Sequence, residues 1–317
     1  MTSFLAIAKK VDAVPYPHER DFIHFFNNVY TLKSHDDTFN LGYILKPIYE
    51  ELAKFPQYFE ANESNRTIKF SITLDTALKR ECALEEIGKS WSKQPLFDTL
   101  KGWRNEKYTI YDDKQCVYFR LERAMCPLLG VVMYGVHING YVVGSDGKIK
   151  LWVPRRAANK PTYPGMLDNT VAGGLGYPYG PLETCYKECY EEAGLKEEYV
   201  AQHIKSAGVV SYLYQLKPND FESEMGLIQP EVEYVYDLQM QSGVKPYPVD
   251  HESEDFQLLS LDEVKLRILN GEFKDNCAAI IVDFMIRQNL ITPESEPNFI
   301  EINNRLHRFL PFPVKNN

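Results

Sequence analysis

Three glutamates in the middle of the chain, Glu188, Glu191 and Glu192, are the residues best suited to chemistry. Positions i, i+3 and i+4 of a helix share one face, so their carboxylates are expected side by side. Like charges at this spacing destabilise an isolated helix by about 0.2–0.5 kcal/mol per pair. Mg²⁺ would neutralise them, because it takes oxygen ligands and commonly joins carboxylates to substrate phosphates. The same pattern occurs on ordinary solvated helix faces, so the spacing alone leaves both interpretations open.

The residues around these glutamates favour the metal site. A short strand is expected at 170–172, and it ends at the pair Gly173-Gly174. Glycines let backbone groups approach a metal ion or a phosphate closely. Pro181 suits the first turn of a helix and Gly194 its C-terminal end, which predicts a helix over 181–193. A glycine-rich turn leading into a capped, glutamate-bearing helix is more than a solvated face requires.

The segment GGLGYPYGPLETCYKECYEEAGL, residues 173–195, resembles the Nudix box, G-x5-E-x7-R-E-U-x-E-E-x-G-U, where U is aliphatic. Its second half matches over 187–195, with Lys187 in place of Arg and Cys189 in place of the aliphatic residue. The resemblance implies that Glu188, Glu191 and Glu192 are catalytic: they bind the metal and activate water. It also implies that the backbone carbonyl of Gly174 is a further metal ligand.

The first half of the box departs from the family pattern. Tyr179, or Gly180 if the loop is one residue shorter, stands where the early glutamate belongs, and neither is acidic. In the family that glutamate pairs with the arginine that Lys187 replaces. Both ends of the ion pair have therefore changed together. Glu183, one helical turn before Lys187, is expected to pair with it instead.

Further stretches, at 134–141, 151–156 and 160–169, look like the thiamine pyrophosphokinase-related Nudix proteins of fungi and plants. Those proteins place a domain of unknown function before a Nudix domain. The resemblance implies an α+β fold, with a Nudix α/β/α sandwich around a mixed sheet and a smaller α/β domain before it. It also implies hydrolysis of thiamine pyrophosphate and its oxidised oxo and oxy derivatives to the monophosphate plus phosphate.

Other candidate residues keep two interpretations. Arg155, Arg156 and Lys160 lie just before the box, where they could bind a pyrophosphate, since arginine can hold phosphate through two hydrogen bonds. A solvated strand end explains them equally well. Glu252 is a candidate for a later metal ligand, although it lies in what could be a plain acidic loop. His137, on an amphipathic strand, is more typical of a structural histidine.

The elements that must position these residues are clearest after residue 120. Residues 133–143 and 148–155 predict a hairpin across Ser145-Asp146-Gly147. Strands follow at 209–216 and 232–238. The pair Ser260-x-x-Glu263 is a capping box that opens a helix to about 270, and a last apolar helix is expected at 278–288. Before residue 120, the patterns predict helices at 22–31, 45–59, 76–90 and 91–99, and strands at 68–72, 108–111 and 117–120.

We therefore expect an N-terminal domain at 1–122, a Nudix domain at 123–290 and a C-terminal tail at 291–317 packed irregularly on the surface. The N-terminal domain is expected to carry no catalytic group. Glu81, Glu85 and Glu86 share helical spacing there, but without a glycine-rich turn they are interpreted as a solvated face.

Composition narrows the function classes. The net charge of −9, from 35 basic and 44 acidic residues, argues against a nucleic-acid-binding surface. The six cysteines form no C-x-x-C pair, which disfavours a zinc site or a disulfide framework. No apolar run approaches the roughly 20 residues that span a bilayer, and acidic residues soon follow the short apolar stretch at 4–8, which disfavours a signal sequence.

We therefore expect a soluble, cytoplasmic enzyme that acts on a small-molecule pyrophosphate, with Mg²⁺ as the cofactor and Mn²⁺ as a possible substitute. Two alternatives remain. One is a Nudix hydrolase of nucleotides such as an oxidised dNTP or ADP-ribose. The other is a catalytically silent Nudix-fold binding module.

Overall fold

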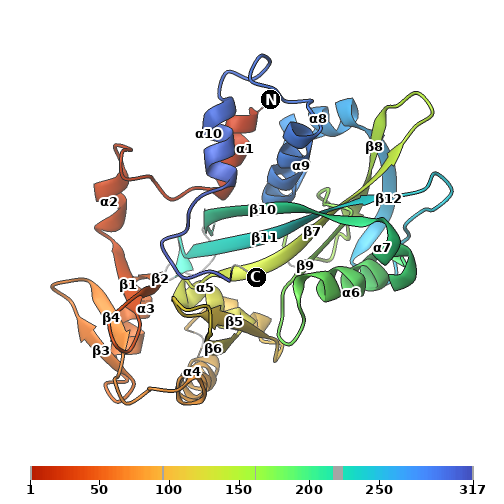
Figure 1. The fold of residues 1–317 in the computed structure, drawn as a ribbon. Helices are drawn as coiled ribbons and strands as arrows, with labels where there is room; N and C mark the ends of the chain where they lie inside the picture. The colour runs from red at the N-terminus through yellow and green to blue at the C-terminus, as the bar shows by residue number, and fades with distance from the viewer. Residues whose placement is uncertain (1, 95, 161, 217–223, 316–317) are drawn as a thin grey trace.

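The computed structural model describes residues 2–315, apart from residues 95, 161 and 217–223. The chain forms a smaller N-terminal α/β region beside a larger sandwich of helices around one central sheet (Figure 1). This arrangement confirms the predicted α+β fold. Among the described residues, no helix is long and apolar enough to cross a membrane.

The smaller region contains a four-stranded sheet in the order β2-β1-β4-β3 and a separate pair, β5 and β6. Its elements are α2 (Phe22–Phe26), β1 (Val29–Lys33), β2 (Asn40–Leu45), α3 (Lys46–Ala53), β3 (Phe59–Asn62), β4 (Thr67–Phe70), α4 (Ala77–Ser92), η1 (Asp98–Gly102), β5 (Lys107–Tyr111), β6 (Val117–Glu122), η2 (Arg123–Met125) and α5 (Cys126–Leu129). Large side chains of α4, β4 and β6, among them Trp91, Phe70 and Phe119, fill its core.

The larger region is built on a six-stranded mixed sheet in the order β10-β11-β7-β8-β12, with β9 also paired to β7. Its strands are β7 (Met133–Val143), β8 (Ile149–Arg156), β9 (Val171–Gly174), β10 (Ile204–Gln215), β11 (Ile228–Gln239) and β12 (Ser253–Ser260). Strands β7 and β11 run parallel, and the other pairs are antiparallel.

Helices cover both faces of this sheet, as an α/β/α sandwich requires. Its helices are α1 (Phe4–Val11), α6 (Pro181–Ala193), α7 (Glu197–His203), α8 (Leu261–Leu269), α9 (Asp275–Arg287) and α10 (Phe299–Leu306). Figure 1 shows α1, α9 and α10 above the sheet and α6 below it. Each face has its own apolar core: one contains Val153, Tyr212 and Phe284, and the other contains Val136, Ile138 and Cys189.

Local signals set the ends of the helices that matter for the site. Pro181 occupies the first turn of α6, and Gly194 ends it in the left-handed conformation, with φ 65°. Ser260 and Glu263 form the predicted capping box of α8. The hairpin of β7 and β8 also lies where the alternation of apolar residues predicts it.

The two predicted helices at 22–31 and 45–59 are wrong in their second halves. Val29, Tyr30 and Thr31 belong to β1, and Phe59 begins β3. These residues are β-branched or aromatic and prefer the extended backbone of a strand. The predicted helix at 91–99 is also absent: α4 ends at Ser92, and the short turn η1 begins only at Asp98.

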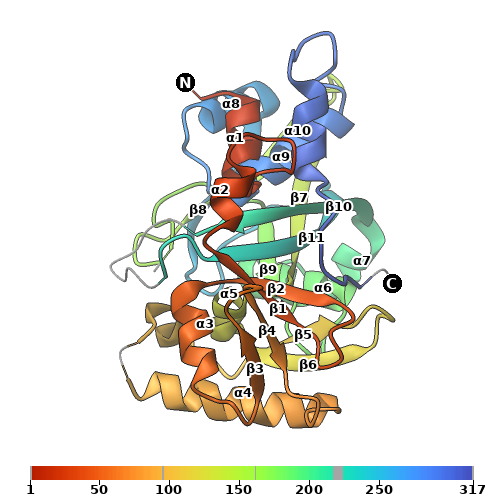
Figure 2. The same ribbon diagram turned by 90° about the vertical axis from the view of Figure 1, so that its left-hand side faces the viewer.

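Both ends of the chain pack on the larger region. Helix α1 lies against α9 and α10, although the sequence assigned it to the N-terminal domain. Figure 2 shows α1 at the opposite side of the sheet from β1–β4 and α4. The tail is not irregular throughout, because α10 buries Ile302 and Leu306 against α1 and β10.

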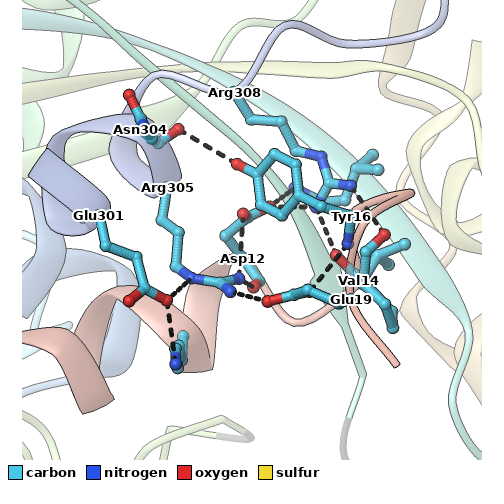
Figure 3. Close-up of polar contacts among 11 residues, drawn as sticks. Asp12, Val14, Tyr16, Glu19, Glu301, Asn304, Arg305 and Arg308 are labelled. Atoms are coloured by element: carbon cyan, nitrogen blue, oxygen red, sulfur yellow. Dashed lines mark hydrogen bonds and ion pairs between the residues drawn. The ribbon is translucent and has the colours of Figure 1, made fainter. Parts of the chain in front are cut away.

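A buried network of charges joins the two ends (Figure 3). Arg308 donates to Asp12 Oδ1 over 2.8 Å, and its guanidinium lies 4.0 Å from the centre of the Tyr16 ring. Arg305 donates to the backbone oxygen of Asp12 over 3.1 Å and pairs with Glu19 and Glu301. The tail then reaches the smaller region, where the ring of Phe312 meets that of Tyr43 edge to face.

Candidate active site and metal centre

Helix α6 presents its glutamates to β9 because its opposite, apolar positions anchor it to the sheet. Cys185, Cys189 and Ala193 are fully buried in the core beneath it. Glu188 is therefore turned toward β9, with only 14% of its side chain exposed, whereas Glu191 is 50% exposed. Gly173 is needed opposite Glu188, since a Cβ there would lie 2.5 Å from the Glu188 side chain.

Glu192 is partly buried and contacts the backbone of β9. Its Oε2 accepts a hydrogen bond from the backbone nitrogen of Ala172 over 3.2 Å. Burial raises the pKa of Glu192 well above its ordinary value, and the charges of Glu188 and Asp168 raise it further. Burial likewise raises the pKa of Glu188. Carboxylates held together under conditions that oppose their charge are typical of a functional site.

A loop before β12 completes a group of oxygen ligands around Glu192. One carboxylate oxygen each of Glu192, Asp250 and Glu252 lies within 4.8 Å of the other two. Oxygen atoms of this kind are the ligands that Mg²⁺ prefers. The structure thus brings Glu252 to the α6 carboxylates and adds Asp250, which the sequence analysis missed. The sequence does contain a pattern that points to Asp250, since Asp250 and Glu252 are two residues apart in one acidic segment.

Two lysines neutralise part of this acidic group. Lys187 Nζ lies 2.9 Å from Glu188 Oε1 and 3.0 Å from Glu191 Oε2. Lys160 pairs with Glu252. Glu183 does not pair with Lys187, contrary to expectation, because its carboxylate accepts from the backbone nitrogen of Gly180 and caps the helix. With Tyr179 in place of an early glutamate, the lysine turns to the site carboxylates instead.

The two candidate arginines are engaged by the loop between β8 and β9. Arg155 donates to the backbone oxygen of Gly165 over 2.8 Å. Arg156 donates to Asp168 over 2.6 Å and to the backbone oxygen of Thr162 over 3.0 Å. These contacts shape the loop. They engage all three side-chain nitrogens of Arg156, whereas Arg155 uses only Nη1.

Lys274 is a second residue that the sequence analysis missed. It is the N-cap of α9, and its backbone nitrogen donates to Leu167 over 3.0 Å. Its ammonium makes no ion pair or hydrogen bond with the residues that the structure describes. Burial lowers the pKa of Lys274, but Cys277 and Asp168 outweigh it and hold that pKa above its usual value. Nothing in the local sequence distinguishes this lysine from any other at a helix start.

The smaller region reaches the glycine turn of the site. A Cβ on Gly174 would lie 1.7 Å from Tyr108 Oη, so only glycine fits beneath this tyrosine of β5. Tyr177, in the same turn as Gly174, also contacts the smaller region. Its backbone nitrogen donates to the backbone oxygen of Lys107 over 2.8 Å, and its ring centre lies 4.0 Å from the Arg120 guanidinium. The region therefore supports the turn between β9 and α6.

Comparisons with known proteins agree with this architecture. Residues 36–133 match the family described as a domain of unknown function, DUF4743, and residues 133–277 match the NUDIX domain. An uncharacterized protein of Saccharomyces cerevisiae is 41% identical over 99% of this chain and 93% of its own. Nudix hydrolase 20, chloroplastic, of Arabidopsis thaliana is 34% identical over 84% of this chain and 70% of its own.

Among solved structures, the protein DR0079 from Deinococcus radiodurans is similar with a TM-score of 0.39 and 20% identity, over 56% of this chain and 99% of its own. The family assignment rests on the sequence matches, which extend through both regions of the chain. The chain belongs to the Nudix hydrolases and is an enzyme that acts on phosphoanhydride bonds.

Proposed function

We propose that this enzyme is a Mg²⁺-dependent pyrophosphohydrolase of thiamine-type pyrophosphates, which it cleaves to the monophosphate and phosphate. The observation that supports the metal-dependent reaction best is the meeting of Glu192 with Asp250 and Glu252 beside the buried Glu188. Closely spaced carboxylates that repel one another fit a divalent cation, which offsets the cost of their charge.

Glu188, Glu192 and Glu252 would hold the ion, with Asp250 and the carbonyl of Gly174 as further ligands. Bound Mg²⁺ supplies positive charge to the phosphate oxygens and favours ionisation of a water molecule. We assign to Glu191, at the exposed side of the same helix face, a role in proton transfer from the attacking water. Lys187 contacts both Glu188 and Glu191 and keeps them oriented.

The substrate class rests mainly on the resemblance to the thiamine pyrophosphokinase-related Nudix proteins. The pairing of a Nudix domain with the preceding domain of unknown function supports it. Lys160, Arg155 and Arg156 remain proposed pyrophosphate ligands. Lys160 and Arg156 would have to exchange their present partners for the substrate, whereas Arg155 would use donors other than Nη1.

A direct comparison of substrates tests this proposal. The values of kcat/KM for thiamine pyrophosphate, its oxo and oxy derivatives, 8-oxo-dGTP and ADP-ribose would be measured at one Mg²⁺ concentration. We expect the thiamine compounds to be preferred, with the damaged forms favoured. A tenfold advantage of either nucleotide over every thiamine compound would replace our substrate with a nucleotide.

A further inference from the structure

The sheet face opposite α6 carries a second group of polar residues. Glu231 and Glu233 project from β11 on the same side as His137 from the adjacent β7, since alternate residues of a strand share a face. Cys277 of α9 covers this face, and its Sγ lies 2.6 Å from Asp168 Oδ1. Glu233 pairs in register with Gly135, and Gly135 pairs with Gly174 of the glycine turn. The group is therefore two strand positions from the metal site.

Glu233 lacks the partners that a buried carboxylate normally has. Only 6% of the residue is exposed. Its Oε2 makes no hydrogen bond with any described residue, and its Oε1 receives a single long bond, over 3.4 Å, from Tyr212. A Cβ on Gly135 would lie 2.2 Å from Oε2, so this glycine makes room for the carboxylate. Buried acceptors without donors are rare in native proteins and call for an explanation.

A chain of hydrogen bonds fixes the histidine beside Glu233. Asp237, paired with Arg287, only accepts, so Asn139 must offer it an N–H, over 3.2 Å. Asn139 Oδ1 then accepts from Asn169, over 3.0 Å.

Asn169 Oδ1 is left to accept from His137 Nδ1, over 2.8 Å. His137 Nδ1 therefore carries a proton, and its other nitrogen, Nε2, faces Glu233 Oε2 at 3.6 Å. Burial lowers the pKa of His137, but Glu233 outweighs burial and the pKa is raised well above its usual value.

The charge of this pair indicates what it can recognise. A protonated His137 cancels the charge of Glu233, so the pair has little attraction for a cation as such. Because His137 Nε2 lies 3.6 Å from Glu233 Oε2, the ion pair leaves this oxygen without a hydrogen bond of normal length from a described residue. Glu231, two residues along the same strand, is partly exposed, and burial with the charge of Glu233 raises its pKa to about 7. The group therefore suits a substrate that donates a hydrogen bond.

We propose that Glu233, held by His137, is a specificity residue that accepts a hydrogen bond from a ring N–H or amino group on the organic part of the pyrophosphate substrate. The inference rests on the proposed pyrophosphohydrolase activity but does not depend on the substrate being a thiamine compound. Thiamine pyrophosphate and ADP-ribose both carry such a group. Benzyl pyrophosphate has an aromatic ring and no N–H, and it serves as the reference compound.

The variant Glu233→Gln tests the role directly. Its amide is neutral, so a hydrogen bond from the substrate loses its charged acceptor. We expect kcat/KM for thiamine pyrophosphate to fall about tenfold or more, mainly through KM, as loss of a hydrogen bond to a charged group implies. The value for benzyl pyrophosphate should change less than twofold. Glu198→Gln, an exposed carboxylate of α7, is the control and should change neither.

Equal losses for both compounds would overturn the proposal, because they would indicate general damage to the site. If the variant does not fold, competition on the wild-type enzyme decides instead: thiamine monophosphate should inhibit at least tenfold more tightly than benzyl phosphate, and equal inhibition contradicts us. If the enzyme prefers nucleotides, the thiamine assignment fails, while the same comparison with ADP-ribose still tests Glu233.

Discussion

The carboxylates of α6 differ in their surroundings, although the sequence presents them as equivalent. Glu192 is partly buried near Glu188 and Asp168, whereas Glu191 is half exposed and paired with Lys187. A buried carboxylate without a nearby cation opposes folding, and a bound cation reverses that effect. Glu192 should therefore lower the stability of the metal-free protein more than Glu191 does, and it should contribute more to metal binding.

This difference predicts two opposite effects of Glu192→Gln. We expect kcat to fall by orders of magnitude because a metal ligand is lost. The metal-free variant should melt at a higher temperature than the wild type, by roughly 2–4 °C for each 1 kcal/mol gained. Turnover at saturating Mg²⁺ and thermal unfolding in chelator would be compared, and near-normal turnover in the variant would contradict the assignment.

The raised pKa of Glu192 also predicts how the stability of the metal-free protein changes with pH. Because the pKa of Glu192 is raised in the folded protein, protonation favours the fold at low pH, and this stability is lost as pH rises through the folded-state pKa. The stabilisation by Gln should therefore be small near pH 5 and larger near pH 8. A difference in melting temperature that shrinks with rising pH would show that Glu192 is not the strained group.

A test of Lys274 distinguishes it from Lys160, the lysine that the sequence analysis expected to bind the pyrophosphate. The Lys274 ammonium makes no ion pair with the residues that the structure describes, so it is available to bind the pyrophosphate, whereas Lys160 already pairs with Glu252. We expect Lys274→Met to raise the inhibition constant of methylenediphosphonate with Mg²⁺ about tenfold, and Lys205→Met, an exposed control, to leave it unchanged. If Lys160→Met raised the inhibition constant more than Lys274→Met did, Lys160 would be the pyrophosphate ligand, as the sequence analysis expected.

At the scale of the elements, the sequence predicted what local signals encode. Pro181 and Gly194 bound α6 and Ser260 opens α8, because caps act through neighbouring residues. The boundaries of β1 and β3 could not be read in the same way, since pairing with distant strands decides them. In the site, helical spacing revealed the three glutamates, whereas Asp250 comes from a separate loop that only the tertiary fold brings to Glu192.

Helix α4 corrects one interpretation and supplies a prediction. Glu81 is not on a solvated face: its side chain is only 13% exposed, and it accepts from the backbone nitrogen of Arg120 over 3.0 Å. We expect Glu81→Ala to lower stability by about 1–3 kcal/mol, because a buried donor loses its partner. Glu85→Ala, which loses an exposed pair with Lys89, should change stability little and serves as the control.

Hydrolysis by the folded fraction should remain largely unchanged in both variants, since neither residue lies among the site carboxylates. Urea unfolding and kcat at saturating substrate would be measured together. Loss of kcat in a folded Glu85→Ala protein would contradict the prediction that the N-terminal domain carries no catalytic group.

At the scale of the whole molecule, the ends of the chain hold the two regions together. Helix α1 belongs to the core of the larger region, and the tail runs from α10 past Leu310 and Phe312 to a core shared with the smaller region. Lys315 then meets Tyr134 of β7, whose hydroxyl accepts from its backbone nitrogen over 2.9 Å. We retain a division near residue 122 as a proposal, with residues 2–14 and the tail as extensions of the Nudix region.

This arrangement predicts that Asp12 is essential to the stability of both regions, although it is far from the metal site in sequence and carries no chemistry. Asp12→Ala leaves Arg308 buried without its carboxylate, which typically costs about 3–5 kcal/mol. Glu301→Ala removes an exposed partner of Lys9 and Arg305 and should cost no more than about 1 kcal/mol. Urea unfolding followed by tryptophan fluorescence would report both regions, because Trp91 and Trp152 lie in different cores. A single transition at lower urea is expected for Asp12→Ala; an unchanged midpoint, or a shift no larger than that of Glu301→Ala, would show that the buried charges do not join the ends of the chain energetically.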